Sequence, residues 1–166
     1  MRRDRRDANI TVESPLESTV AYLEGTMPPI DVLFVCLHGS AKSVIAAEHC
    51  RHLAALRGLG IAVASAGLEP DDQIPANVVD GLASDGIRID YRKPERINAA
   101  ILSRSCYVVA IGCTIATAPE PMFIHWSDIP AVDDDYGAAR NIIVAKLTVL
   151  VDEIAGRHGL GPARET

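Results

Sequence analysis

The chain has 166 residues, of which 48% are hydrophobic and 23% are charged, a balance that fits one globular domain and excludes a disordered chain. Its formal net charge of −6 argues against a general nucleic-acid-binding protein. Because no apolar stretch is long enough to cross a membrane and the start has no signal-peptide pattern, we expect a cytoplasmic protein without membrane partners.

Residues 1–30 are expected to form an extension that precedes the main domain. Ser14 and Glu17 have the spacing of a capping box, and apolar residues recur every three or four positions as far as Leu23, which predicts a short helix. Such a helix can cover part of the domain or a partner subunit in a homodimer. The alternative is a loose arm.

Predicted strands and helices alternate over residues 31–158. Strands are expected at residues 32–35, 61–65, 106–111 and 122–125, and helices at residues 43–56, 71–86 and 94–103 and after the acidic residues 133–135. This alternation predicts a single α/β domain with a parallel sheet covered on both faces. Residues 159–166 are expected to be a flexible tail.

The first predicted strand ends at Cys36, and a short loop of small residues leads into a helix near Ser43. Backbone N–H groups and the positive end of the helix converge at such a loop, so it can hold an anion and favour a thiolate. We therefore predict Cys36 as a nucleophile, although a buried cysteine at a strand end is the plainer alternative. The loop between Cys36 and Ser43 consists of Leu37, His38, Gly39, Ser40, Ala41 and Lys42.

The remaining histidines and cysteines do not form a metal-binding pattern. The four cysteines lack C-x-x-C spacing, and His49 and His52 have no carboxylate that completes a ligand set. We expect neither a metal nor a cofactor. Lys42 lies where a cation is unfavourable at the start of a helix, unless it neutralises a bound anion.

A cysteine, five residues, then a basic residue and a serine after the first strand resemble the loop of low-molecular-weight protein tyrosine phosphatases and of the arsenate reductases that share their fold. Ser65-Ala66-Gly67 after the second strand matches the Ser-Ala-Gly of that family. Further similar segments, Gly86-Ile87, Val108-Val109 and His125-Trp126, follow in the family's order. The resemblance covers roughly residues 31–156 and implies a flavodoxin-like sheet with four parallel strands in the order 2-1-3-4.

The resemblance also implies a chemistry. Cys36 would attack the phosphorus or arsenic of a phosphate, an arsenate or a phosphorylated small molecule or protein. The amides of residues 37–42 would hold the oxyanion, and Ser43 would hydrogen-bond the thiolate. Lys42 stands where the family has an arginine, and a lysine lacks the planar pair of donors, which costs ~10²–10³ in rate.

The chain differs from the family at two other places, the residue that supports the loop and the general acid. Gly39 replaces the asparagine that props the loop in the family, and Ala131-Val132 falls where the family has Asp-Pro. Asp128 and Asp133 are the candidate acids nearby. The alternative is that they supply negative charge to the start of the last helix.

Cys113 follows the third predicted strand, where a redox cysteine of the related reductases lies. The position expected for its partner is Glu120, so reduction would require an external thiol reductant. Three hypotheses remain: a weakened phosphatase or arsenate reductase, a degenerate module that binds an oxyanion or a phosphoprotein, and an interaction protein that dimerises through its extension.

Overall fold

The computed structural model describes residues 29–90, 93–115, 122–157 and 159. The predicted N-terminal helix around Ser14, the residue Glu120 and nearly all of the predicted tail lie outside the described residues. In chain order the elements are β1 (Ile30–Cys36), α2 (Lys42–Leu56), β2 (Val63–Gly67), α3 (Ala76–Ser84), α4 (Ala99–Ser103), β3 (Ser105–Ile111), β4 (Met122–Trp126) and α5 (Tyr136–Arg157).

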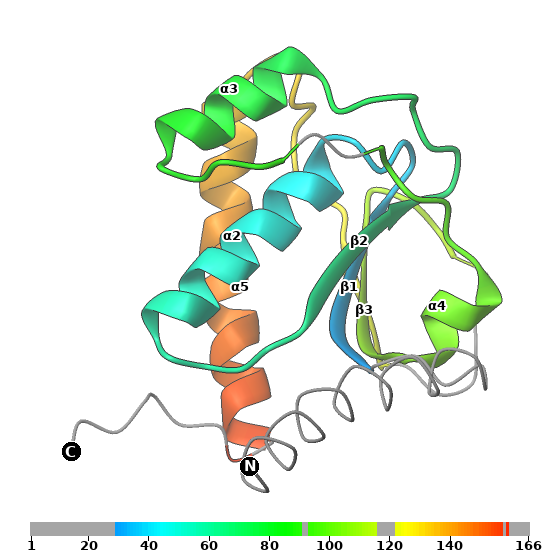
Figure 1. Cartoon of the computed structure of the whole chain (residues 1–166), viewed down its shortest axis with the longest axis vertical. Coiled ribbons are helices and arrows are strands. Elements are labelled where there is room, and N and C mark those ends of the chain that lie inside the picture. The colour runs from blue at the N-terminus through cyan, green and yellow to red at the C-terminus, as the bar shows by residue number, and fades with distance from the viewer. Residues whose placement is uncertain (1–28, 91–92, 116–121, 158, 160–166) are drawn as a thin grey trace, which may run out of the picture.

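The four strands form one parallel sheet in the order β2-β1-β3-β4 (Figure 1), which confirms the predicted strand order. The central strand β1 is apolar and buried on both faces, as parallel strands require. Its pairing register with β2 places Cys36 opposite Gly67. The carboxyl ends of these strands therefore meet at one edge of the sheet, and the loops that follow them lie side by side.

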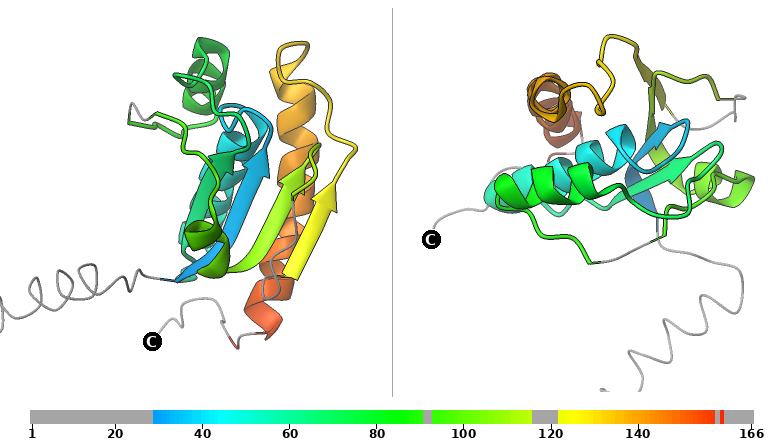
Figure 2. Two further views of the ribbon diagram at one scale, coloured as in Figure 1. Left: turned by 90° about the vertical axis from the view of Figure 1, so that its right-hand side faces the viewer. Right: turned by 90° about the horizontal axis from the view of Figure 1, so that it is seen from above.

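Alternate side chains of β1 and β3 point into two separate cores on opposite faces of the sheet. Phe34 and Val109 pack with α2, α3 and α5 on one face, whereas Leu33 and Val108 meet Ile101 of α4 on the other. Figure 2 shows the three longer helices on one side of the sheet and the short α4 on the opposite side. Helices therefore cover both faces of the sheet, as predicted. Among the described residues, one face carries more helical structure than the other.

The third predicted helix, at residues 94–103, is wrong in its first half. Helix α4 begins only at Ala99, because the backbone before it pairs with the end of β2. The N–H group of Gly67 donates to the carbonyl of Glu95 at 2.8 Å, and that of Ile97 donates to the carbonyl of Gly67 at 2.9 Å. Asn98 then caps α4 by accepting a hydrogen bond from the N–H group of Ile101.

Two other local expectations differ from the structure. Helix α3 begins at Ala76 rather than at Asp71, which leaves Asp71 in a loop at the carboxyl edge of the sheet. Strand β2 covers Val63–Gly67 rather than residues 61–65, and Leu56, the last residue of α2, is 73% exposed. Among the described residues, no helix combines the length and the apolar character needed to cross a membrane.

Candidate active site

A pocket of about 340 Å³ lies at the carboxyl edge of the sheet, where parallel α/β folds bind their ligands. It is lined by the loop after β1, the β2–α3 loop, the end of β3 and the loop before α5. The lining residues are Cys36, Leu37, His38, Ser40, Ala41, Lys42, Asp71, Pro75, Ile111, Gly112, Ala131, Val132 and Asp133. The predicted nucleophile, most of the predicted loop and one candidate acid therefore surround a single pocket.

Cys36 and Ser43 form a buried pair at the base of this pocket. The Cys36 Sγ atom donates to the Ser43 Oγ atom at 3.1 Å, and Ser43 is completely buried. Once the thiol loses its proton, the hydroxyl group can rotate and donate to the sulfur instead. The contact therefore places the Ser43 hydroxyl group within hydrogen-bond distance of a thiolate at Cys36.

The backbone of the loop is fixed by the neighbouring β2–α3 segment. The carbonyl groups of Cys36, Leu37 and His38 accept hydrogen bonds from the N–H groups of Leu68 (3.2 Å), Glu69 (2.7 Å) and Asp71 (3.1 Å), respectively. No peptide bond is cis among the described residues, so each N–H group points opposite to the carbonyl that precedes it. The N–H groups of residues 37–39 therefore point away from the β2–α3 segment and can donate to an oxyanion.

The N-terminus of α2 adds positive character to the loop. Among the described residues, no side chain caps this end, and the first turn of the helix has no acidic residue. The first N–H groups of a helix have no partner inside it, so an uncapped end attracts anions. The Lys42 Nζ atom lies near Gly112 at the end of β3, 3.6 Å from the position of a Cβ atom added there, and brings a full positive charge to the pocket.

Gly39 is the one predicted loop residue that does not line the pocket. Its φ angle is +61°, and a Cβ atom added to it would lie 2.7 Å from the Gly67 nitrogen. A Cβ atom added to Gly67 would lie 2.5 Å from the Gly39 nitrogen. Because only glycine combines that backbone angle with so close an approach, these two residues allow the loops to pack together.

The structure separates the two candidate acids. Asp133 lines the pocket, whereas Asp128 does not. The Asp128 carboxylate lies 3.1 Å from the Lys146 Nζ atom, and the hydrogen bond from Lys146 holds the pKa of Asp128 below its usual value. Asp135 accepts a hydrogen bond from the N–H group of Ala138 at 3.0 Å and so caps α5.

Cys113 lies just after β3 and close to the predicted nucleophile. Its Sγ atom is 3.6 Å from the carbonyl oxygen of Val35, the residue before Cys36. Burial raises the pKa of Cys113, and the charge of Cys36 raises it further. The higher pKa favours the thiol form of Cys113. Burial raises the pKa of Cys50 to about 12, so that cysteine is a packed thiol in the core.

Asp71 also lines the pocket, although no motif in the sequence marks it as a functional residue. Its Oδ2 atom accepts a hydrogen bond from the Ser40 Oγ atom at 2.6 Å, and its Oδ1 atom lies 3.5 Å from the His38 Nδ1 atom. The signal in the sequence is its position shortly after β2. Residues that follow adjacent parallel strands meet at the same edge of a sheet.

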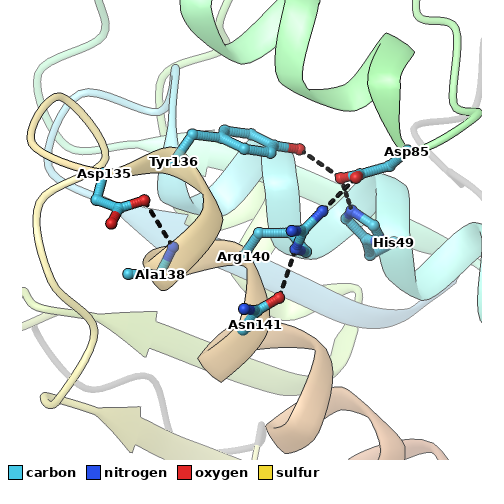
Figure 3. A network of polar contacts seen from close by, with 7 residues as sticks. All are labelled: His49, Asp85, Asp135, Tyr136, Ala138, Arg140 and Asn141. Carbon is cyan, nitrogen blue, oxygen red and sulfur yellow. Dashed lines mark hydrogen bonds and ion pairs between the residues drawn. The ribbon is translucent and has the colours of Figure 1, made fainter.

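A second polar cluster joins the helices behind the pocket (Figure 3). The Asp85 carboxylate accepts hydrogen bonds from the His49 Nε2 atom at 3.1 Å, from the Tyr136 hydroxyl group at 2.8 Å and from the Arg140 guanidinium group. Burial acts to raise the pKa of Asp85, but these three donors outweigh it and hold the pKa below its usual value. The cluster fixes α2, α3 and α5 relative to one another, and each of these helices follows a wall of the pocket.

Within the described part of the chain, no group of three or more histidine, cysteine, aspartate or glutamate side chains could hold a metal ion. The described residues place several groups around one pocket. They are the Cys36 sulfur, backbone N–H groups of the loop, the Lys42 ammonium group and the Asp133 carboxyl group.

Several solved structures are similar to most of the chain. A thioredoxin-dependent arsenate reductase of Corynebacterium glutamicum, Cg_ArsC1', has a TM-score of 0.65 and 26% identity, covering 86% of this chain and 69% of that chain. An arsenate reductase of Archaeoglobus fulgidus has a TM-score of 0.57 and 24% identity, covering 76% and 99%. SP-PTP, a low molecular weight protein tyrosine phosphatase of Streptococcus pyogenes, has a TM-score of 0.62 and 11% identity, covering 75% and 92%.

The last two similarities, at low identity, concern the fold alone, and no curated protein matches the sequence. Residues 31–125 match the family described as low molecular weight phosphotyrosine protein phosphatase. This match spans more than half of the chain, from β1 into β4. The chain therefore belongs to the low molecular weight phosphotyrosine protein phosphatase family.

Proposed function

We propose that the protein uses the Cys36 thiolate to attack a phosphate or arsenate held by residues 37–42, with slow turnover. The substrate class is phosphate, arsenate or a phosphorylated small molecule or protein. The observation that carries the proposal is the buried Cys36–Ser43 contact of 3.1 Å at the base of a pocket that also contains the uncapped start of α2.

With a phosphate monoester, the reaction has two steps. The Cys36 sulfur forms a bond to phosphorus while the bond to the leaving oxygen breaks, and Asp133 gives that oxygen a proton. A water molecule then attacks phosphorus and gives a proton to Asp133, the sulfur–phosphorus bond breaks, and Cys36 regains its thiolate form. Ser43 makes the sulfur a better leaving group in this second step because it donates a hydrogen bond to the developing charge.

Lys42 and the loop amides stabilise the charge that develops on the transferred group. Lysine supplies one localised charge, whereas an arginine would supply two parallel donors to two oxygens. Loss of one preorganised donor commonly lowers the rate by ~10²–10³. This is the physical reason for proposing slow turnover.

With arsenate, the same thiolate would form a sulfur–arsenic bond and displace one oxygen as water. A thiol reductant would then attack the Cys36 sulfur, form a disulfide with it and release arsenic as arsenite, two electrons richer. Cys113 lies near Cys36, and an external thiol remains the proposed reductant. The similarity to Cg_ArsC1' supports testing arsenate beside phosphate esters.

Hydrolysis of an aryl phosphate, compared between the wild type and Cys36→Ser, tests the proposal. We expect slow hydrolysis by the wild type and none by the variant, with arsenate reduction in the presence of a dithiol measured in parallel. Equal rates for both proteins, in both assays, would refute the proposed role of Cys36.

A second candidate function is an oxyanion- or phosphoprotein-binding module without turnover. Lys42 in place of an arginine and Ala131-Val132 at the edge of the pocket favour it, because they weaken catalysis more than binding. Phosphate that binds to a wild type without activity in either assay would support this alternative.

A further inference from the structure

We propose that Asp71 is a positioning residue of the oxyanion site, which holds the loop after β1 in its binding conformation from the neighbouring β2–α3 loop. This role of Asp71 rests on the proposed function, in which that loop binds the oxyanion. Gly39 has no side chain that could hold the loop from within. Asp71 contacts the loop at the side chains of His38 and Ser40 and at the backbone.

The first contact is with Ser40, in the middle of the loop. Ser40 is only 2% exposed, and its hydroxyl group donates to the Asp71 Oδ2 atom at 2.6 Å. Hydrogen bonds to an ionised acceptor are shorter and about twice as strong as neutral ones. The flanking Gly39 and Ala41 have no polar side chains, so this bond is the side-chain tether of the central loop.

The second contact is with His38. The backbone N–H group of Asp71 donates to the His38 carbonyl group at 3.1 Å, and the Asp71 Oδ1 atom lies 3.5 Å from the His38 Nδ1 atom. The same ring nitrogen lies 3.2 Å from the Glu69 carbonyl oxygen. This acceptor favours the tautomer with the proton on Nδ1, so the imidazole ring is held against the β2–α3 loop.

The charge of Asp71 cannot itself favour an anionic ligand. A carboxylate that lines the pocket repels a phosphate or arsenate, since like charges in a partly buried site oppose each other. The benefit of Asp71 to oxyanion binding must therefore come from the position that it gives to Ser40 and His38. Asparagine separates the two effects, because it keeps an oxygen acceptor for Ser40 and removes the charge.

The test compares Ser40→Ala, Asp71→Ala and Asp71→Asn with the wild type. The control is Asp72→Ala, which removes the exposed carboxylate of the next residue along the chain. Two quantities are measured for each protein: the exchange rate of the backbone amides in residues 36–43, and the dissociation constant of inorganic phosphate. The amide exchange needs no ligand and no activity.

We expect Ser40→Ala and Asp71→Ala to speed amide exchange in the loop by about tenfold, as expected for the loss of a charged hydrogen bond. Ser40→Ala should weaken phosphate binding by about the same factor. Asp71→Asn, which keeps a weaker, neutral acceptor for Ser40, should exchange at a rate between those of the wild type and Asp71→Ala. It should bind phosphate at least as tightly as the wild type, whereas Asp71→Ala should bind it more weakly than Asp71→Asn does. Combining Ser40→Ala with Asp71→Ala should add little to either single change.

Unchanged exchange in both alanine variants would overturn the positioning role, and so would equal behaviour of Asp71→Ala and Asp71→Asn. The second result would mean that Asp71 acts only through its charge. A wild type that does not bind phosphate would instead contradict the proposed function. In that case the amide exchange of the variants still decides whether Asp71 holds the loop.

Discussion

Lys42 is the residue to which the proposed slow turnover is assigned. Its ammonium group lies beside Gly112, where the absence of a Cβ atom leaves room for a larger head group. Lys42→Arg should therefore raise kcat/KM for an aryl phosphate by ~10²-fold, because a guanidinium group can bind two oxygens of the transition state.

Steady-state kinetics of the wild type and of Lys42→Arg measure this effect, with Lys146→Arg as the control outside the pocket. No increase with Lys42→Arg would mean that the lysine does not limit the rate. The limit would then lie in the general acid or in the loop.

Substitutions at Asp133 and Asp128 test which carboxyl group is the general acid. Asp133 lines the pocket, whereas Asp128 pairs with Lys146. Asp133→Asn should lower kcat by ~10²–10⁴, the usual contribution of a general acid, and Asp128→Asn should leave kcat within a factor of about two.

The leaving group provides an internal check on this assignment. An aryl phosphate with an acidic phenol needs little protonation of the leaving oxygen, so the effect of Asp133→Asn should shrink with such a substrate. An effect that is the same for all leaving groups would remove Asp133 from that role.

At the scale of elements, the close approach of the loops after β1 and β2 controls the shape of the site. Gly39→Ala should lower the free energy of unfolding by more than the roughly 1–2 kcal/mol that a left-handed backbone costs a residue with a Cβ atom, because the added atom would also meet the backbone of Gly67. Chemical denaturation measures the change.

Gly60→Ala is the matched control for this prediction. A Cβ atom at Gly60 would meet no atom within 4 Å, and its φ angle is not positive. The control should change stability by less than about 1 kcal/mol. Equal effects of the two substitutions would contradict the close approach of the loops.

The elements also show how far the sequence determines the fold. Hydrophobic runs and β-branched residues predicted all four strands. The pattern is strongest in the central strands β1 and β3, which are almost entirely buried because helices cover both faces of a parallel sheet. The helix predicted from residue 94 begins late, because Glu95 and Ile97 pair with Gly67, a tertiary contact that local helix propensity does not register.

The residues of the candidate site also differ in how far the sequence alone predicts them. Cys36, Ser43 and the loop lie in one continuous segment, so their spacing made them predictable. The role of Asp71 depends on a contact with Ser40 across 31 positions of the chain. The need for glycine at residue 39 depends on Gly67, and neither relation has a local pattern.

At the scale of the whole molecule, the cluster around Asp85 makes stability depend on pH. Burial lowers the pKa of His49 from 6.5, and this outweighs the opposite effect of the hydrogen bond that His49 donates to Asp85. The unfolded chain therefore takes up this proton at a higher pH than the folded protein does. The free energy of unfolding should fall as the pH decreases below 6.5.

Asp85 contributes in a lower range. Burial acts to raise its pKa, but the hydrogen bonds from Tyr136, Arg140 and His49 together lower it from 3.8. Its stabilising contribution is therefore present above 3.8 and is lost as the pH falls through the lower value of the folded protein. Both groups make acid destabilising.

Thermal unfolding between about pH 7 and pH 5 separates the contribution of His49 from that of Asp85. His49→Gln keeps a donor for Asp85 and removes the titrating ring, so the melting temperature should depend less on pH than in the wild type. His52→Gln, an exposed histidine on the same helix, is the control and should keep the dependence of the wild type. A His49→Gln variant with the unchanged slope would contradict the prediction.

In the proposed function, the loop after β1 holds a tetrahedral oxyanion within reach of the Cys36 sulfur. The most direct measurement is the rate at which iodoacetamide alkylates Cys36 at increasing phosphate concentrations, followed by mass spectrometry of the peptide that contains Cys36. We expect phosphate to slow this alkylation to a saturating limit while the alkylation of exposed Cys106 remains constant. If the alkylation rate of Cys36 did not change with the phosphate concentration, the loop would not hold phosphate next to the Cys36 sulfur.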